Sequence, residues 1–193
     1  MTQFQPETSI TPPDHLRHQF TVAEFERLSQ SGVFQDKKVE LIEGVIVEMP
    51  AMGDLHVMWM GVLTRKLVMT LLECATVYPQ IPLDLGLKRT QPEPDFVIVK
   101  LENDHKRKPT VAEASFIIEV SDSTLRDDRT WKLELYARQG VKEYWILNVQ
   151  HHQLEVYRDP EGETYKTKFT LSRGEAVTPL EFSDVVLEWW GNL

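Results

Sequence analysis

Cysteine is almost absent from this sequence of 193 residues, because Cys74 is the only one. A single cysteine cannot form a disulfide within the chain, which fits a reducing compartment such as the cytoplasm. No run of residues is long and apolar enough to cross a bilayer. The first residues also lack the basic segment and apolar core of a secretory signal. We therefore expect a cytoplasmic protein without a membrane partner.

The sequence also has no excess of positive charge. Its 21 Lys and Arg residues against 30 Asp and Glu residues give a formal net charge of -9. This balance argues against a protein that coats nucleic acid through a basic surface, but not against a nuclease, whose metal site adds acidic groups. A Walker loop, a dinucleotide-binding glycine fingerprint, a nucleophile-elbow serine and a zinc-protease helix are missing as well. We expect no small-molecule cofactor.

The composition is that of an ordinary globular domain, with 41% hydrophobic and 26% charged residues. Residues 1–19 contain Pro6, Pro12, Pro13 and many polar groups, which predicts an irregular N-terminal arm. The length of the remainder, residues 20–193, predicts one domain with a sizeable core.

Hydrophobic spacing predicts alternating helices and strands. A capping-box pattern at Thr21 and Glu24 predicts a helix that extends to about Ser29. Alternating apolar and polar residues over 39–49 predict a hairpin. Apolar residues at helical spacing predict the longest helix over 54–73. Further strand candidates are 76–78, 81–87, 94–99, 115–120, 143–148, 153–158 and 165–171, with a second helix over 127–139 and an apolar patch over 185–190. This order indicates an α/β fold with a mixed central sheet flanked by helices.

Two of these strands carry a carboxylate at matching ends. Asp95 opens the first apolar run, and Glu119 lies near the end of the second. A charged group in such a run is costly unless something offsets the lost hydration. If the strands pair antiparallel, the two acids lie side by side, where they repel unless they share a proton or a metal ion.

The chemistry of these side chains indicates a site for metal-dependent phosphodiester cleavage. Magnesium prefers oxygen ligands and is often held by one or two carboxylates together with substrate phosphate. Asp95 and Glu119 would supply the carboxylates, and the backbone carbonyl of Val120 a third oxygen. Lys132, on the following predicted helix, would orient the attacking water and stabilise developing negative charge.

Three more residues near Lys132 are accessory candidates. Asp128, Lys132 and Tyr136 follow one another at i, i+4 spacing, so a continuous helix would present them on one face. Arg129 lies next to that stripe and could contact a DNA phosphate. A tyrosine in such a position is more often part of the core than of a site.

The order of these motifs resembles the PD-(D/E)XK nuclease superfamily and, within it, the Uma-two family of restriction-endonuclease-like proteins. The residues that carry the resemblance are Pro94-Asp95, Glu119-Val120-Ser121, Asp128-Arg129 with Lys132 and Tyr136, Glu143-Tyr144-Trp145-Ile146, and the segment 39–46 followed by His56. The resemblance extends from about Phe20 to Trp190. Each motif is weak alone, and their order and spacing together are fairly specific.

The resemblance implies a restriction endonuclease-like core made of a helix, a three-stranded antiparallel meander, a second helix and a further strand. The predicted N-terminal hairpin and C-terminal antiparallel strands would be additions to that core. It also implies magnesium-dependent cleavage of DNA, with manganese as a substitute. The superfamily's motif lysine would fall on Ser121, so the resemblance maps that lysine onto Lys132 instead. Glu40 becomes a candidate for an additional metal contact.

Other interpretations stay open at this point. His56, near a helix start, is either a structural hydrogen-bond partner or an accessory group of the site. The chain could be a non-catalytic binding or regulatory module that keeps the nuclease fold. It could also be an interaction protein that oligomerises through its C-terminal strands and Trp189-Trp190. We expect a homodimer, because an acidic single-domain nuclease needs two subunits to form a DNA groove.

Overall fold

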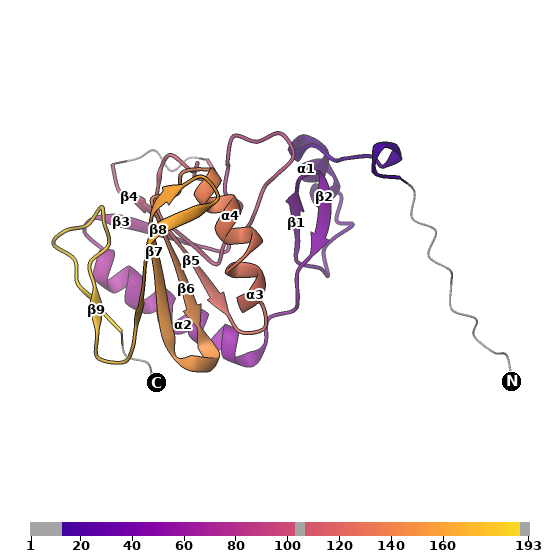
Figure 1. Ribbon diagram of the computed structural model, residues 1–193. Helices are drawn as coiled ribbons and strands as arrows, with labels where there is room; N and C mark the ends of the chain where they lie inside the picture. Colours follow the sequence, from indigo (N-terminus) through magenta and orange to yellow (C-terminus); the bar gives the residue numbers. More distant parts are fainter. Residues whose placement is uncertain (1–12, 103–106, 190–193) are drawn as a thin grey trace, which may run out of the picture.

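A six-stranded mixed sheet forms the centre of the computed structural model, which describes residues 13–102 and 107–189 (Figure 1). The strands lie in the order β3-β4-β5-β6-β7-β8. Their bounds are Ala75–Pro79 for β3, Phe96–Lys100 for β4, Ala114–Ser121 for β5, Glu143–Asn148 for β6, Gln153–Glu161 for β7 and Thr164–Leu171 for β8. β5 and β6 pair in parallel, and the other neighbours in this sheet pair antiparallel.

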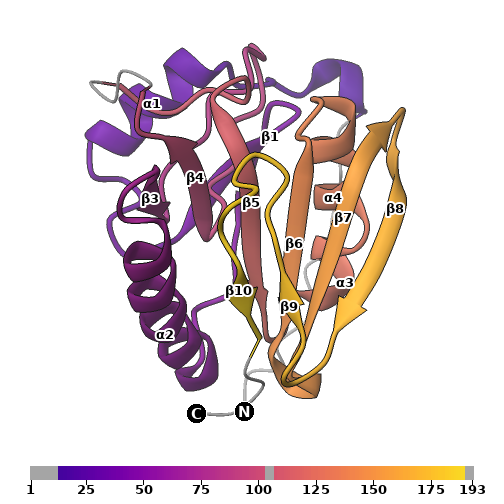
Figure 2. The same cartoon turned by 90° about the vertical axis from the view of Figure 1, so that its left-hand side faces the viewer.

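Each face of the sheet is covered by a separate layer (Figure 2). The long helix α2 (Asp54–Leu71) and the small hairpin of β9 (Ala176–Val177) and β10 (Leu187–Glu188) pack on one face. The short helices α3 (Leu125–Asp128) and α4 (Trp131–Arg138) cover the other. α2 buries Trp59, Leu63, Leu67 and Leu71, which recur every four residues and therefore form one stripe against the sheet.

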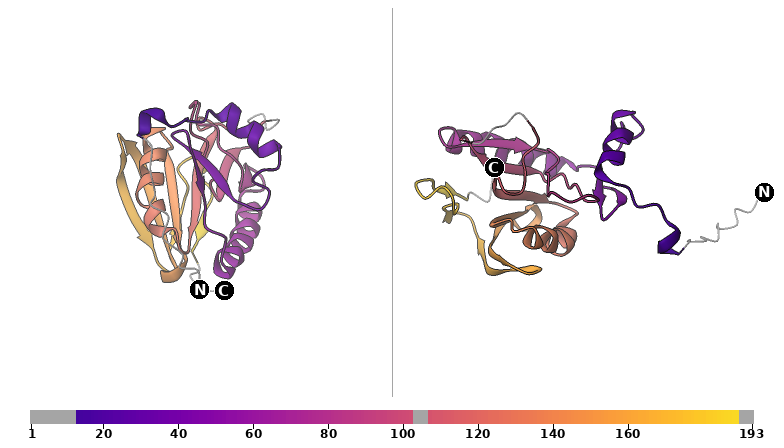
Figure 3. Two further views of the ribbon diagram at one scale, coloured as in Figure 1. Left: turned by 90° about the vertical axis from the view of Figure 1, so that its right-hand side faces the viewer. Right: turned by 90° about the horizontal axis from the view of Figure 1, so that it is seen from above.

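The N-terminal part forms a lobe beside one end of the sheet (Figure 3). It contains η1 (Asp14–Leu16), α1 (Val22–Gln30) and the hairpin of β1 (Val39–Ile42) and β2 (Val45–Glu48). The predicted capping box is confirmed, because Thr21 Oγ1 accepts from the Glu24 amide at 3.3 Å and the Thr21 amide donates to Glu24 at 2.8 Å. Gly44 turns the hairpin at φ 81°, where a Cβ would lie 2.7 Å from Gln19 Cβ.

The centre of the sheet is buried on both faces. Every residue of β5 and of β6 is buried, which explains why both strands read as continuous apolar runs instead of alternating. A short 3-10 helix, η2 (Val149–His151), follows β6 and leads into β7. Polar side chains inside these strands, such as Glu119 and Glu143, must therefore find partners within the protein.

The structure confirms the α/β class, the mixed sheet, the N-terminal hairpin and the antiparallel pairing of the two carboxylate strands. The predicted strand over 81–87 is wrong: this segment forms only an isolated bridge, between Asp84 and Thr110. Pro82 interrupts the donor pattern that a strand needs, and Gly86 adopts φ 70°. Residues 1–12 of the predicted arm lie outside the described residues.

The single helix predicted over 127–139 is also wrong, because the chain forms α3 and α4 with a break at Thr130. The φ and ψ angles of Thr130 are -116° and -99°, far from helical values. The hydroxyl of Tyr144 donates to the backbone carbonyl of Asp128 at 3.1 Å. A continuous helix would use that carbonyl for the amide of Lys132, so the buried tyrosine takes the place of a helical hydrogen bond.

Leu187 and Trp189 of the C-terminal patch are part of the interior, whereas Val186 is exposed. Trp189 is buried, stacks on Trp59 with 5.5 Å between ring centroids, and donates its indole N–H to the His152 carbonyl at 2.9 Å. Its ring is therefore not available as an exposed oligomer surface, while Trp190 lies outside the described residues. Within residues 13–102 and 107–189, no helix has the length and apolar character to cross a membrane.

Replacement of Trp189 by alanine should therefore destabilise the fold by about 3–5 kcal/mol, because it leaves a cavity against Trp59. Urea unfolding followed by fluorescence measures this. The matched change Val186→Ala, at an exposed position of the same segment, should stay within about 0.5 kcal/mol of the wild type. Equal effects of the two changes would show that the aromatic stack does not support the fold.

Candidate active site

Asp95 and Glu119 lie side by side at one end of the sheet. The register pairs Phe96 with Ile118, so the residue before β4 comes opposite Glu119 in β5. The Val120 amide donates to Asp95 Oδ2 at 2.9 Å, and the Asp95 amide points at Glu119 Oε2 at 3.4 Å. Both side chains are buried. The antiparallel pairing therefore brings the two acids together, as the sequence predicted.

The ammonium of Lys132 is the cation of this cluster. Its Nζ lies 3.0 Å from Glu119 Oε1, 3.5 Å from Asp128 Oδ1 and 3.9 Å from Glu40 Oε1. The residue is only 4% exposed. Burial lowers the pKa of Lys132, but the adjacent carboxylates outweigh this and hold the pKa above its usual value. The side chain is therefore charged at neutral pH.

Tyr136 and Asp128 fix the groups around this lysine. The Tyr136 hydroxyl donates to Glu119 Oε1 at 2.9 Å, so that oxygen has two donors. Asp128 Oδ2 accepts from the hydroxyls of Ser121 and Thr124 at 2.6 and 2.7 Å. The broken helix still places Asp128, Lys132 and Tyr136 together, because α4 starts directly after the break.

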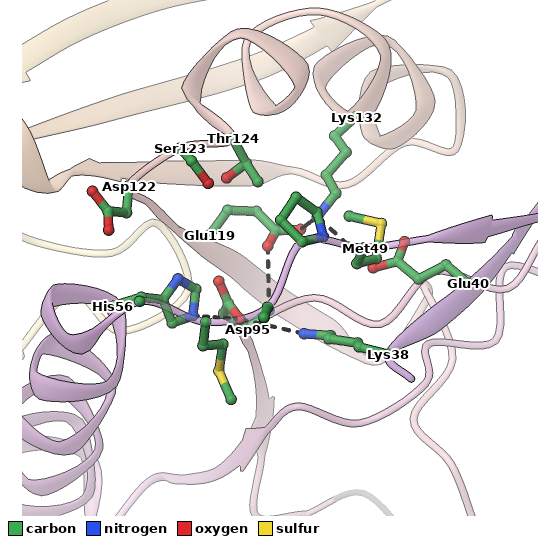
Figure 4. A pocket seen from close by; sticks show the side chains of 14 residues that line it. Lys38, Glu40, Met49, His56, Asp95, Glu119, Asp122, Ser123, Thr124 and Lys132 are labelled. Atoms are coloured by element: carbon green, nitrogen blue, oxygen red, sulfur yellow. Dashed lines mark hydrogen bonds and ion pairs between the residues drawn. The ribbon is translucent and has the colours of Figure 1, made fainter. Parts of the chain in front are cut away.

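His56 and Lys38 contact the other acid. His56 Nε2 lies 3.3 Å from Asp95 Oδ1, and Lys38 Nζ lies 3.8 Å from the same oxygen (Figure 4). His56 belongs to the first turn of α2, which begins after Gly53. A Cβ at Gly53 would meet Asp122 Oδ2 at 3.1 Å, so glycine lets the helix start come close to the end of β5.

Burial and neighbouring charge move the pKa values of the acids apart. Burial raises the pKa of Glu119, and the negative charges of Asp95 and Asp128 raise it further. The ammonium of Lys132 lowers the pKa in part, and together these effects raise it to about 8. Burial also raises the pKa of Glu40. For Asp95 burial acts in the same direction, but the contact with His56 outweighs it and holds the pKa below its ordinary value. One acid of the pair thus ionises much more readily than the other.

Glu40 lacks the partners that a buried carboxylate normally has. The residue is 1% exposed, and neither of its carboxylate oxygens has a hydrogen-bond partner within the part of the chain that the structure describes. The ammonium of Lys132 lies 3.9 Å from Glu40 Oε1. A buried carboxylate without donors is costly, which identifies this position as one that can accept a further ligand.

These side chains line a small pocket of about 40 Å³ (Figure 4). The segment between β2 and α2 forms one wall, and the turn after β5 forms the other. The lining residues are Lys38, Glu40, Met49, Pro50, Ala51, Met52, Gly53, His56, Asp95, Glu119, Asp122, Ser123, Thr124 and Lys132. The acids and the lysine therefore line one small pocket at the end of the sheet.

Of the predicted site residues, Arg129 is the one that the structure places elsewhere. Its guanidinium forms an ion pair with the buried Glu155 of β7, and it does not line the pocket. Its role as a contact to a DNA phosphate stays a prediction.

Two charged residues near the pocket, the basic Lys38 and the acidic Glu93, were not among the predicted site residues. Lys38 lines the pocket, and Glu93 lies 3.9 Å from its Nζ. Lys38 precedes Glu40 by two residues, and alternation along a strand puts both side chains on one face, so the sequence carried a signal for it. Glu93 has no such pattern, since it lies in the irregular segment before β4.

The donor set suits a hard cation with few protein ligands. No group of three or more His, Cys, Asp or Glu side chains among residues 13–102 and 107–189 converges as a metal-binding cluster. Asp95 and Glu119 remain, and the Val120 amide, which donates to Asp95 Oδ2, holds the backbone of Val120 beside them. Two carboxylates with a backbone oxygen fit Mg²⁺, which keeps several waters or substrate oxygens, better than an ion that needs a complete protein cage.

Comparisons with known proteins give the family of the chain and a structure with a similar fold. The chain is similar to a crystal structure described as "a putative nuclease belonging to DUF820" from Anabaena variabilis ATCC 29413, with a TM-score of 0.65 and 15% identity over 86% of this chain and 92% of that one. At this identity the likeness shows the fold. No curated protein matches the chain. The family model Uma2, described as "Putative restriction endonuclease", matches residues 22–189, and the chain therefore belongs to the Uma2 family.

Proposed function

We propose that the protein is a magnesium-dependent endonuclease that hydrolyses DNA phosphodiester bonds, with Mn²⁺ as a substitute for Mg²⁺. The observation that carries the proposal is the buried cluster of Asp95, Glu119 and Lys132 at the wall of a pocket. Membership of a family described as "Putative restriction endonuclease" and a fold shared with a protein described as "a putative nuclease" support the reaction class. DNA as substrate and the metal are our own assignments.

The residues present fit a divalent cation. Four buried carboxylates, those of Glu40, Asp95, Glu119 and Asp128, share the site with the ammonium of Lys132. The raised pKa of Glu119 and the unpartnered oxygens of Glu40 show an excess of negative charge that the protein itself does not offset. Asp95, Glu119 and the Val120 carbonyl would hold the ion, with Glu40 in reach of the same pocket.

Bound there, Mg²⁺ would polarise the phosphoryl oxygen and lower the pKa of a water molecule. The chain's own groups position the reaction. Lys132 directs its ammonium at the pocket, where it can orient the attacking water and stabilise negative charge on phosphate. Tyr136 and the Lys132 ammonium hold Glu119 Oε1, which leaves Oε2 with only the 3.4 Å contact to the Asp95 amide. His56 keeps Asp95 ionised.

A second candidate is a nuclease-fold module that binds without cleaving. The specific observation in its favour is that no three-ligand metal cluster exists among the described residues. It predicts a folded protein with weak metal binding and no cleavage. The two experiments below separate it from the catalytic proposal.

Asp95→Asn and Lys132→Met should each lower magnesium-dependent nicking of supercoiled plasmid by at least about 100-fold, because each removes a charge that the transition state needs. Gel assays with Mg²⁺ and with Mn²⁺ measure the nicking rate. Lys142→Met is the matched control, since Lys142 is exposed, pairs with Glu181 and lies outside the pocket. Thermal unfolding of each variant shows whether the fold is retained. Equal nicking by all four proteins would assign the activity to a contaminant or another site.

Metal binding should strengthen as the pH rises. In the metal-free protein the pKa of Glu119 is about 8, so at lower pH a proton occupies the carboxylate that the cation needs. Mn²⁺ should therefore raise the Tm more at about pH 8.5 than at about pH 6.5. Glu119→Gln should show a small shift that does not depend on pH. A larger shift of the wild type at the lower pH would contradict Glu119 as a ligand.

A further inference from the structure

The pocket contains a second lysine, Lys38, to which the proposed reaction gives no role. Lys38 lies directly before β1 in the N-terminal lobe, and its Nζ lies 3.8 Å from Asp95 Oδ1 and 3.9 Å from Glu93 Oε1. Figure 4 shows Lys38 and Lys132 reaching the pair of acids from different sides, with Lys38 beside Asp95 and Lys132 beside Glu119. The pocket therefore has two ammonium groups that belong to separate parts of the fold.

The two lysines differ in how far the protein itself uses their hydrogen-bond donors. An ammonium group has three N–H donors. The side chain of Lys132 is 5% exposed, donates to Glu119 Oε1 at 3.0 Å and has two further carboxylates within 3.9 Å. The side chain of Lys38 is 26% exposed, and its ammonium makes no hydrogen bond within residues 13–102 and 107–189. The donors of Lys38 can therefore serve a group that enters the pocket.

Backbone hydrogen bonds determine the position of Lys38. Its carbonyl accepts from the Met49 amide at 2.8 Å, which continues the pairing of β1 with β2 by one residue. The hairpin is in turn joined to the segment before β4, since Leu41 and Gln91 exchange two backbone hydrogen bonds, of 3.4 and 2.7 Å. That segment leads to Asp95, so the same hydrogen bonds set where the Lys38 ammonium lies relative to the acid.

Stability alone does not explain a lysine at this position. Ion pairs of partly exposed side chains contribute little to stability, and the two pairs of Lys38 lack a hydrogen bond. Burial raises the pKa of Glu93, and the charge of Lys38 offsets this only in part. Lys38 is therefore a weak counterion for its own neighbours. A ligand that brings a negative charge and acceptor oxygens would use its ammonium more fully.

We propose that Lys38 is a substrate-binding residue whose ammonium donates to a phosphate oxygen of the DNA strand in the pocket. The inference rests on the proposed function, because that function makes the ligand a nucleic acid. The pocket volume of about 40 Å³ holds about three groups of the size of a water molecule. Phosphate oxygens fit this space, whereas a nucleobase is too large. Lys132 then serves the reacting groups, and Lys38 holds the strand.

The salt dependence of DNA binding tests this contact, because each neutralised phosphate adds about 0.9 to the slope of log Kd against log salt concentration. Fluorescence anisotropy of a labelled duplex gives Kd in Ca²⁺, which takes oxygen ligands as Mg²⁺ does. Lys38→Met should raise Kd about tenfold at low salt and lower the slope by about one. Lys38→Arg keeps the charge and should keep the slope.

Lys37→Met is the matched control for this measurement. Lys37 precedes Lys38 in the chain, is 52% exposed, pairs with Glu48 and does not line the pocket. Both Met variants have the same net charge, so a general electrostatic effect would change both alike. Lys37→Met should keep the wild-type slope, and thermal unfolding shows that each variant is folded. An equal change of slope in both, or none in Lys38→Met, would overturn the proposal.

Nicking kinetics separate this inference from the proposed function. Lys38→Met should raise KM about tenfold, as it does Kd, while kcat changes much less. A loss confined to kcat would contradict a role in binding. If the wild type binds DNA without nicking it and the slopes still differ, the cleavage proposal fails and the contact of Lys38 stands. If the wild type nicks DNA and Lys38→Met binds as tightly as the wild type, the contact is wrong and the cleavage proposal stands.

Discussion

The contact of the Lys132 ammonium with the Glu119 carboxylate is the interaction on which the rest of the site depends. It joins α4 to the end of β5 through two side chains that are almost fully buried at the wall of the pocket. Buried ion pairs add little net stability, since well-packed apolar residues are often as good, and removing one partner is strongly destabilising. A cluster of four carboxylates and one lysine at the end of the best-buried strand is therefore poorly explained by stability. Chemistry at the pocket explains it better.

The sheet topology accounts for how distant residues meet. Antiparallel pairing of β4 with β5 fixes Asp95 beside Glu119, and the parallel step to β6 requires a crossover that carries α3 and α4. That crossover brings Asp128, Lys132 and Tyr136 over the same end of β5. α2, on the opposite face, contributes its first turn, and the N-terminal hairpin contributes Glu40 (Figure 3). The site thus lies where two layers and a lobe converge.

The sequence contained enough to predict the class of fold and most of the cluster. Asp95 and Glu119 were identifiable because a charge in an apolar strand is unusual, and their pairing followed from antiparallel geometry. The break at Thr130 was not predictable, because it depends on the Tyr144 hydroxyl, sixteen positions after Asp128, reaching a backbone carbonyl. The ion pair of Arg129 with Glu155 of β7 was not predictable for the same kind of reason, because it also joins residues that are far apart in the sequence. The local pattern of apolar and polar residues specifies helices and strands, whereas hydrogen bonds between distant residues decide where a helix is interrupted.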